Sequence, residues 1–263
     1  MSKYLTTAYS IIQPGREREH TEDFIWTQDL SSGKTDTETA NAHIFLIADG
    51  KGCYPGCLQA EQIICPFIID CIQKCYDEAR ETFLNDPIFH LKMAMYSANK
   101  VIGGFKLGNE EKYNGYGASV TIALVLDDKL YYAHVGNTRL YILRQQRLRQ
   151  LTKDQTAAQQ LLDEGKINEE LYYSLPESRT LTGGLGYVAD PEIESGKLRI
   201  KNDDIFLMTT DGIHMFLRPQ GMADLILSAG TCEGGANVLL EAGEELGSGD
   251  DMSCTIFTCY GES

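Results

Sequence analysis

Short apolar runs bounded by turn residues are the feature that most limits how this chain can fold. Two of them, His43–Ala48 and Ile205–Thr210, end directly at Asp-Gly, and a third, Ala118–Leu126, is followed by Asp-Asp. Runs of this length are typical of buried strands. They come in groups, and the stretches with helical spacing come in pairs, which favours separate layers over alternating βαβ units. The sequence therefore predicts an α+β fold.

The expected elements follow in chain order. Strands are expected over Thr6–Ile12, His43–Ala48, Ala118–Leu126, Lys129–His134, Leu140–Arg144, Leu148–Leu151, Ile205–Thr210 and Ser253–Tyr260. Helices are expected over Cys57–Glu81, Ile88–Ile102, Thr156–Gly165, Asn168–Ser174, Gln220–Ala229 and Gly235–Leu246. Short turns would join the strands between 118 and 151 into one meander. The polar stretches 29–41 and 109–117 are too short to link domains, so we expect residues 1–263 to form a single domain.

The charge balance argues against two classes of partner. The formal net charge is −15, and a chain this acidic repels both the phosphate backbone and anionic lipid. We therefore expect no nucleic-acid partner and no membrane association. No apolar run approaches the roughly 20 residues of a membrane helix, and the N-terminal segment lacks the apolar region of a signal peptide. These features favour a cytoplasmic protein.

The eight cysteines do not predict a disulfide framework, which is typical of small secreted chains. Cys71 and Cys75 stand four residues apart in an expected helix, a spacing that could hold a metal. Neither a nearby histidine nor a Cys-x-x-Cys motif supports that interpretation. We expect reduced thiols that fill core space, with a zinc site as the less favoured alternative.

Aspartates stand at the ends of three apolar strands. Asp49 and Asp211 each end an apolar run before a glycine, and Asp250 with Asp251 precedes the last strand. A carboxylate at such a rigid, partly desolvated position needs a cation or a hydrogen-bond donor to offset its charge. Oxygen ligands select hard cations such as Mg²⁺ or Mn²⁺. Asp-Gly is also a common turn dipeptide, so each position alone could be only a turn.

A second charged segment, Arg18-Glu19-His20-Thr21-Glu22-Asp23, precedes the apolar residues 24–26 and predicts the start of a strand. The planar fork of an arginine can hold a phosphate through two hydrogen bonds. The acidic pair could hold water on a metal. Charged strand ends are common and usually solvated, so this segment alone is a weak signal.

Eight segments along the chain together resemble the motifs of the PP2C-type (PPM) metal-dependent protein phosphatases. In order they are Arg18–Asp23, Ile47–Gly52, Tyr116–Ser119, Ala133–Arg139, Leu151–Gln155, Leu181–Gly186, Thr209–Ile213 and Asp250–Ser253. One motif would be weak, but eight in the right order and spacing cover nearly the whole chain. The resemblance implies a four-layer αββα sandwich, in which two antiparallel β-sheets pack face to face with a pair of helices on each outer side.

The resemblance also implies the reaction and its metals. Phosphoserine and phosphothreonine in proteins would be hydrolysed by a water activated between two divalent ions, Mn²⁺ or Mg²⁺. The expected partner is a phosphorylated protein, a target of a serine/threonine kinase. Asp49 would bridge both ions and the Gly50 carbonyl would bind one of them. Asp211 and Asp250 would bind the other.

The surrounding residues take their expected roles from the same resemblance. Glu22 and Asp23 would hold waters bound to the metals. Arg18 would clamp the substrate phosphate and act with Asp49 and Asp211 in catalysis. Residues of about 154–180 would form a flap that tunes substrate access.

Several positions depart from the family pattern. Asn137 replaces an aspartate, which implies that a third, weaker metal site is weakened or lost. Asp251 replaces an asparagine and adds negative charge, Gln155 replaces a histidine, and Lys51 stands where relatives carry histidine or methionine. These departures motivate an alternative: a weakly active or non-catalytic module that binds a phosphoprotein or a regulatory partner. An unrelated hydrolase of small phosphoesters is a third hypothesis.

Overall fold

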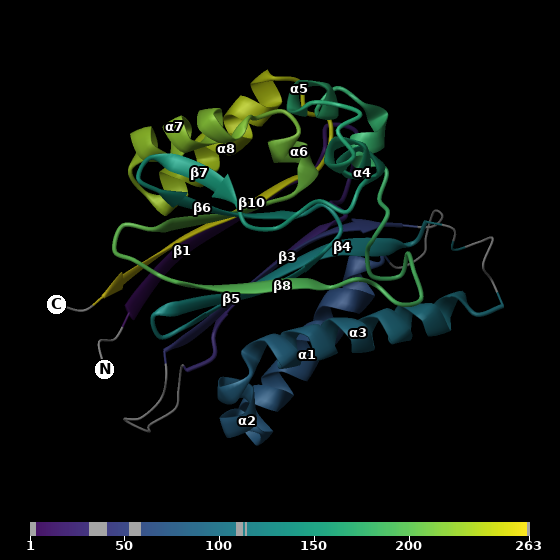
Figure 1. Cartoon of the computed structure of the whole chain (residues 1–263), viewed down its shortest axis with the longest axis vertical. Helices are drawn as coiled ribbons and strands as arrows, with labels where there is room; N and C mark the ends of the chain where they lie inside the picture. The colour runs from purple at the N-terminus through teal and green to yellow at the C-terminus, as the bar shows by residue number, and fades with distance from the viewer. Residues whose placement is uncertain (1–3, 32–40, 53–58, 109–112, 114, 262–263) are drawn as a thin grey trace.

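Two antiparallel sheets lie face to face in the computed structural model, which describes residues 4–31, 41–52, 59–108, 113 and 115–261 (Figure 1). Sheet A runs in the order β1 (Tyr4–Gln13), β10 (Met252–Gly261), β9 (Ile205–Thr209), β6 (Arg139–Arg144) and β7 (Arg147–Gln150). Sheet B runs in the order β2 (Asp23–Asp29), β3 (Ala42–Lys51), β4 (Gly117–Leu126), β5 (Lys129–Val135) and β8 (Glu194–Arg199). The first and last strands pair with each other, which brings the two ends of the described chain side by side.

Helices cover the outer face of each sheet (Figure 1). Sheet B is covered by α1 (Glu61–Glu78), α2 (Arg80–Asn85) and α3 (Pro87–Lys106), and sheet A by α7 (Pro219–Ala229) and α8 (Cys232–Glu245). Four short elements lie near one end of the sandwich: α4 (Ala157–Asp163), α5 (Glu169–Tyr172), the 3₁₀ helix η1 (Pro176–Arg179) and α6 (Asp211–His214). The predicted four-layer α+β sandwich is confirmed.

Three apolar cores correspond to the three interfaces between these layers. β4 is buried along its whole length because both of its faces are covered. Ile122 and Leu124 face the core under α1 and α3, whereas Ala123 and Val125 face the core between the sheets. This is the alternation that a strand imposes on successive side chains. A third core joins sheet A to α7 and α8.

The meander predicted between residues 118 and 151 is wrong at its midpoint. β4 and β5 belong to sheet B, but β6 and β7 belong to sheet A. The chain crosses between the sheets just after β5, at Gly136, where φ is +99° and a Cβ would lie 2.3 Å from Ser119 Oγ. Only glycine fits here, because φ is positive and there is no room for a Cβ. The crossing places Asn137 between the sheets.

Both Asp-Gly dipeptides also lie outside simple turns. β3 continues through Asp49 and Gly50 to Lys51, and Asp211 and Gly212 begin α6. The expected helix over 57–81 begins at Glu61 within the described residues and is followed by the separate short α2. β8 was not expected, because its sequence, ESGKLR, is polar and half exposed at the sheet edge.

The helix expected over 88–102 begins one residue earlier, at Pro87, and Asp86 caps it by accepting a hydrogen bond from the Phe89 N–H at 3.1 Å. The six described cysteines are free thiols, whereas Cys53 and Cys57 lie outside the described residues. No helix among the described residues is long and apolar enough to cross a membrane.

The core between the sheets is organised around a stack of three phenylalanines. Phe257 of β10 stacks on Phe45 of β3 with ring centroids 4.0 Å apart and on Phe206 of β9 at 5.0 Å. All three side chains are buried. The stack joins the two sheets directly.

We predict that Phe257→Ala lowers the free energy of unfolding by about 3–5 kcal/mol, because it opens a cavity between the sheets. Urea denaturation followed by circular dichroism measures this. Phe105→Ala removes a ring that is 48% exposed and serves as the control, with an expected loss below about 1 kcal/mol. Equal losses in the two variants would contradict the role of the stack.

Candidate metal centre

Carboxylates from four segments of the chain lie within electrostatic range of one another at one end of the sandwich. β2 pairs with β3 so that Asp23 lies opposite Asp49. On the facing sheet, the pairing of β9 with β10 brings Asp211 and Asp250 close enough to repel each other. Asp49 in turn lies within electrostatic range of the other three. The structure therefore brings together the acidic residues that the sequence proposed as metal ligands.

Burial and mutual repulsion raise the pKa values of the two central aspartates. Asp211 is 7% exposed, and its pKa rises to about 6, first because burial disfavours the charged form and then because of the charge of Asp250. The pKa of Asp49 rises well above its ordinary value through burial and then through the charges of Asp211 and Asp23. Asp49 still keeps part of its surface open to solvent. A cation between these carboxylates would lower both pKa values by offsetting the repulsion.

Asp23 is held from the facing sheet. Its Oδ2 accepts a hydrogen bond from Thr210 Oγ1 at 2.8 Å, and the side chain is buried. Burial raises the pKa of Asp23 to about 8, although the hydrogen bond from Thr210 favours the charged form. This contact fixes the start of β2 against the end of β9, so that the two sheets present their acids to the same space.

The donor set suits a hard divalent cation. Asp49, Asp211 and Asp250 offer only oxygen atoms, which Mg²⁺ and Mn²⁺ prefer. In the described ranges, no three His, Cys, Asp or Glu side chains already converge at ligating distance. The carboxylates are nevertheless near enough to repel one another, and a cation would draw them together. These residues fit a divalent metal by charge and by donor type.

Gly50 joins the end of β3 to Glu22 through a backbone hydrogen bond. The Gly50 N–H donates to the Glu22 carbonyl at 2.9 Å, and the Gly52 N–H donates to Glu22 Oε1 at 3.0 Å. A Cβ on Gly50 would lie 2.1 Å from a carboxylate oxygen of Glu61 and 2.9 Å from the Glu22 carbonyl oxygen. Only glycine therefore fits directly after Asp49.

Asp251 is a hydrogen-bond hub that the sequence did not reveal. Its side chain is 2% exposed, and its oxygens accept from the Gly15 N–H at 2.7 Å and the Glu22 N–H at 2.7 Å. Arg18 Nη1 donates to the same carboxylate at 2.6 Å. Asp251 thus does more than add negative charge to the site, because it holds the connection between β1 and β2 against the start of β10.

Arg18 lies among the same carboxylates. Its Nη1 also donates to Glu22 Oε2 at 3.0 Å, and its Nη2 lies 3.1 Å from Asp250 Oδ1. Burial opposes the positive charge, but Asp251, Asp250 and Glu22 outweigh it and raise the pKa of Arg18. The side chain is 38% exposed, so it remains accessible beside the acidic cluster. Arg18 thus lies beside Asp250 and Asp251, and its role as a phosphate clamp stays a prediction.

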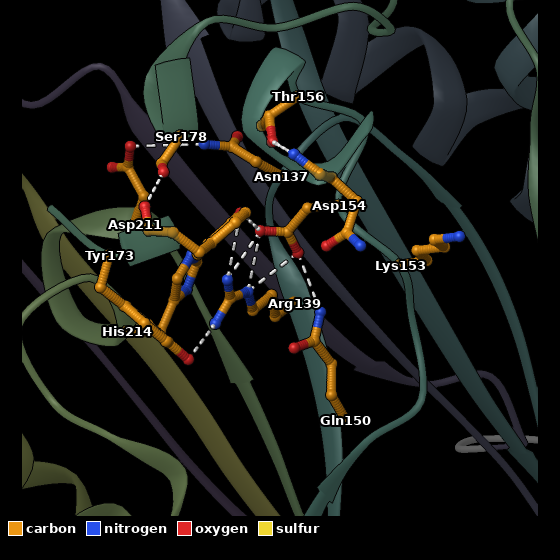
Figure 2. A network of polar contacts seen from close by, with 12 residues as sticks. Asn137, Arg139, Gln150, Lys153, Asp154, Thr156, Tyr173, Ser178, Asp211 and His214 are labelled. Atoms are coloured by element: carbon orange, nitrogen blue, oxygen red, sulfur yellow. Dashed lines mark hydrogen bonds and ion pairs between the residues drawn. The ribbon is translucent and has the colours of Figure 1, made fainter. Parts of the chain in front are cut away.

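Asn137 supports Asp211 directly (Figure 2). Its Nδ2 donates to Asp211 Oδ2 at 3.3 Å, and its Oδ1 accepts from Ser119 Oγ at 2.7 Å. The side chain is 3% exposed. An aspartate in this place could not donate when ionised. The substitution therefore exchanges a negative charge for a neutral hydrogen-bond donor that orients Asp211.

A buried ion pair joins β6 to the beginning of the predicted flap (Figure 2). Arg139 Nε donates to Asp154 Oδ1 at 2.8 Å and Arg139 Nη2 donates to Asp154 Oδ2 at 2.7 Å. Tyr172 Oη donates to the same carboxylate, which attaches α5 to this pair. Burial alone would raise the pKa of Asp154, but the charge and hydrogen bonds of Arg139 outweigh it and lower the pKa to about 2. Sequence reasoning found both residues inside motifs but not their pairing, because they lie on separate elements.

Two further contacts connect the predicted flap segment to the site. Arg179 of η1 lies 3.3 Å from Asp250 Oδ2. Gln155, whose role was not apparent from the sequence, accepts a hydrogen bond from the Gly136 N–H at 3.1 Å and donates to the Glu192 carbonyl at 2.7 Å. The crossing between the sheets and the base of the flap segment are therefore held together.

His214 has no direct contact with the acidic cluster. Its Nδ1 is hydrogen-bonded to Thr209 Oγ1 at 2.9 Å, and burial lowers its pKa well below the ordinary value. This neutral, fully buried imidazole at the end of α6 links the helix to β9. His134 is likewise buried, and its Nδ1 is hydrogen-bonded to Thr121 Oγ1 at 2.8 Å.

We predict that Asp154→Asn lowers the free energy of unfolding by roughly 3–5 kcal/mol near neutral pH, because it leaves the buried Arg139 without its counter-charge. The pKa of Asp154 is about 2 in the folded protein, against an ordinary value of 3.8. Its stabilisation is therefore complete above about pH 4 and is lost as the pH falls towards 2. Urea denaturation of wild type and Asp154→Asn over this range should show that the difference between their free energies of unfolding becomes smaller as the pH falls.

Asp163→Asn is the control for this experiment. Asp163 pairs with Lys153 at 2.7 Å, but both side chains are exposed. Removing this pair should cost less than about 1 kcal/mol. A difference between wild type and Asp154→Asn that stays constant with pH would contradict the assignment.

Comparison with known proteins agrees with this geometry. The family model described as protein phosphatase 2C matches residues 16–233. The serine/threonine phosphatase stp of Listeria monocytogenes is 24% identical over 240 residues, which are 91% of this chain and 90% of that protein. The matched range contains Arg18, Asp49 and Asp211, whereas Asp250 lies beyond its end.

Two solved structures share the fold. The serine/threonine phosphatase of S. agalactiae superposes with a TM-score of 0.81 at 22% identity and covers 98% of this chain and 100% of its own. The catalytic domain of the serine threonine protein phosphatase PstP, in complex with 2 manganese ions, superposes with a TM-score of 0.74 at 19% identity. The match covers 97% of this chain and 99% of the PstP chain. The family model covers residues 16–233, which is most of the chain. The chain belongs to the protein phosphatase 2C family, whose members are metal-dependent.

Proposed function

We propose that this protein hydrolyses phosphoserine and phosphothreonine in proteins, using two divalent ions, Mn²⁺ or Mg²⁺, at the acidic end of the sandwich. The observation that carries the proposal is the mutual electrostatic repulsion of Asp49, Asp211 and Asp250, which come from different segments of the chain. Buried acids that repel one another are costly without a cation. The names of the relatives, and the two manganese ions in PstP, support the same assignment.

The chain's own carboxylates would hold the ions. Asp49 would bridge both, and the Gly50 carbonyl would bind one of them. Asp211 and Asp250 would hold the other, while Glu22 and Asp23 would orient water around them. Divalent ions in such a site lower the pKa of bound water and neutralise charge on a phosphoester.

Arg18 would orient the substrate phosphate. The three carboxylates around it fix the plane of its guanidinium, and the exposed part of the side chain faces solvent rather than core. A planar fork held in this way can present parallel N–H donors to two phosphate oxygens. Asp251 is then a positioning residue, because it acts on the substrate only through Arg18 and Glu22.

The segment over about 154–180 would act as the flap. α4, α5 and η1 lie in this range, and the Arg139–Asp154 pair anchors its beginning while Arg179 contacts Asp250 near its end. A segment anchored at both ends and adjoining the site can control access without being part of the chemistry. The physiological substrate would be a phosphoprotein made by a serine/threonine kinase.

We predict that Asp211→Asn lowers phosphate release from a phosphothreonine peptide by at least about a hundredfold, because it removes a ligand charge at the metal site. Release is measured with Mn²⁺ or Mg²⁺ and again with excess chelator, which should abolish it. Asp224→Asn, on the exposed surface of α7, is the control and should behave as wild type. Release that survives chelation or the Asp211 substitution would overturn the proposed function.

We also predict that Asn137→Asp lowers the free energy of unfolding of the metal-free protein. The same substitution should increase the stabilisation that Mn²⁺ gives. The aspartate loses the hydrogen bond to Asp211 and adds a charge beside it, which costs about 1–3 kcal/mol without metal. The same charge attracts a cation, so the rise in melting temperature on adding Mn²⁺ should exceed that of wild type. Asn137→Ala removes the hydrogen bond without adding charge. An equal Mn²⁺ effect in both variants would contradict a weakened third metal site in the native chain.

A further inference from the structure

A groove of about 900 Å³ lies beside the predicted flap, on a part of the molecule that the metal centre does not use. One wall is β7, the edge strand of sheet A. The other walls are α4 and α5 of the flap segment and the beginning of α7. Arg139 lies at its inner end, and Tyr172 and Tyr173 contribute its aromatic surface.

The groove gathers positive charge. Arg147, Arg149, Lys153 and Arg218 line it, and all four side chains are exposed. Lys153 is paired with Asp163 at 2.7 Å. Arg147, Arg149 and Arg218 form no ion pair with any residue that the structure describes. Three arginines that line the groove are therefore available to a ligand.

This charge stands out against the rest of the chain. The protein has 38 acidic and 23 basic residues and a net charge of −15, so most of its surface repels an anionic segment. Glu169 and Glu170 of α5 also line the groove and limit its positive charge to the side of β7 and α7. An acidic ligand would therefore be drawn to this groove and oriented within it.

The groove is also held in shape. Leu148 packs into the core beneath α7, which leaves Arg147 and Arg149 together on the other face of β7 at its exposed edge. The Arg218 guanidinium lies over the Tyr173 ring, 3.4 Å from its centroid. Such stacking fixes an arginine without neutralising it. A preformed site pays less ordering entropy when a ligand binds.

The inner end of the groove lies close to the metal centre along the chain. Arg139 follows two residues after Asn137, whose amide donates to Asp211. Arg139 also holds Asp154 and contacts Tyr172, at the two parts of the flap segment that border the groove. A peptide that has its phosphorylated residue at the acidic centre could pass around this segment and place neighbouring residues in the groove.

We propose that this groove binds an acidic segment of the phosphoprotein substrate, outside the phosphorylated residue itself. The proposal rests on the proposed phosphatase function and adds a preference for substrates with Asp, Glu or a further phosphate near the target residue. A volume of about 900 Å³, lined by several separate basic side chains, suits a peptide better than a single small anion. Nucleic acid is disfavoured by the net charge of −15.

The test compares matched phosphothreonine peptides that carry either glutamates or glutamines on one side of the phosphothreonine, in both placements, together with p-nitrophenyl phosphate. Two groove variants are compared. The first combines Arg147→Gln with Arg149→Gln on β7, and the second is Arg218→Gln at the beginning of α7. Lys129→Gln/Lys197→Gln removes two exposed cations from sheet B and is the matched control. The readout is kcat/KM for each substrate.

We expect wild type to prefer the acidic peptide in one placement by about fivefold, which is the effect of a few exposed ion pairs. Both groove variants should lose this preference through a higher KM, whereas their rates on the glutamine peptide and on p-nitrophenyl phosphate stay unchanged. The control variant should keep the preference. Raising the salt from about 0.05 to 0.3 M should reduce it in wild type, because exposed charges are screened.

Three outcomes would overturn the groove proposal: no acidic preference in wild type, a preference that survives in both groove variants, or an equal loss on every substrate. A failure of the phosphatase function is recognised separately, because wild type would then not release phosphate from p-nitrophenyl phosphate with Mn²⁺. In that case a fluorescently labelled acidic peptide without phosphate tests the groove directly by anisotropy. Binding that is equal in wild type and both groove variants would again overturn the proposal.

Discussion

Repulsion between buried carboxylates is the constraint on which the rest of the structure depends. Asp23, Asp49, Asp211 and Asp250 approach one another because two sheets converge on the same space, and burial makes their shared negative charge costly. The surroundings are arranged to offset it. Hydrogen bonds from neutral side chains hold individual acids, and Arg18 supplies a positive charge at the solvent edge. A divalent cation would complete this balance, which is the electrostatic basis of the proposed metal site at the acidic end of the sandwich.

A second arrangement joins this centre to the surface around it. The Arg139–Asp154 pair is wholly buried, and both partners reach the flap segment through Tyr172. The same stretch of chain carries Asn137, which orients Asp211. One short crossing between the sheets therefore supports the metal centre on one side and the basic groove on the other. Substrate selection and catalysis would share a single rigid support, in which the flap segment is tied rather than free.

Sequence reasoning succeeded where the signal is local. Apolar runs identified the central strands, helical spacing identified α3, and the order of the motifs identified the layers. It failed where the partner is remote. Short turns look the same whether the next strand stays in one sheet or changes sheet, so the predicted meander was wrong at Gly136. β8 was missed because an exposed edge strand carries little apolar pattern.

The sequence by itself determined the family, the fold class and the identity of the acidic residues, because each of these depends on residue type and order along the chain. Only the tertiary structure decided how the charges are shared. Asp251 proved to be a hub for Arg18 and Glu22, and Arg139 proved to be the partner of Asp154. The grouping of Arg147, Arg149 and Arg218 in one groove was equally hidden. Electrostatic interactions act through space, and residues far apart in the sequence become neighbours only when the sheets and helices have packed.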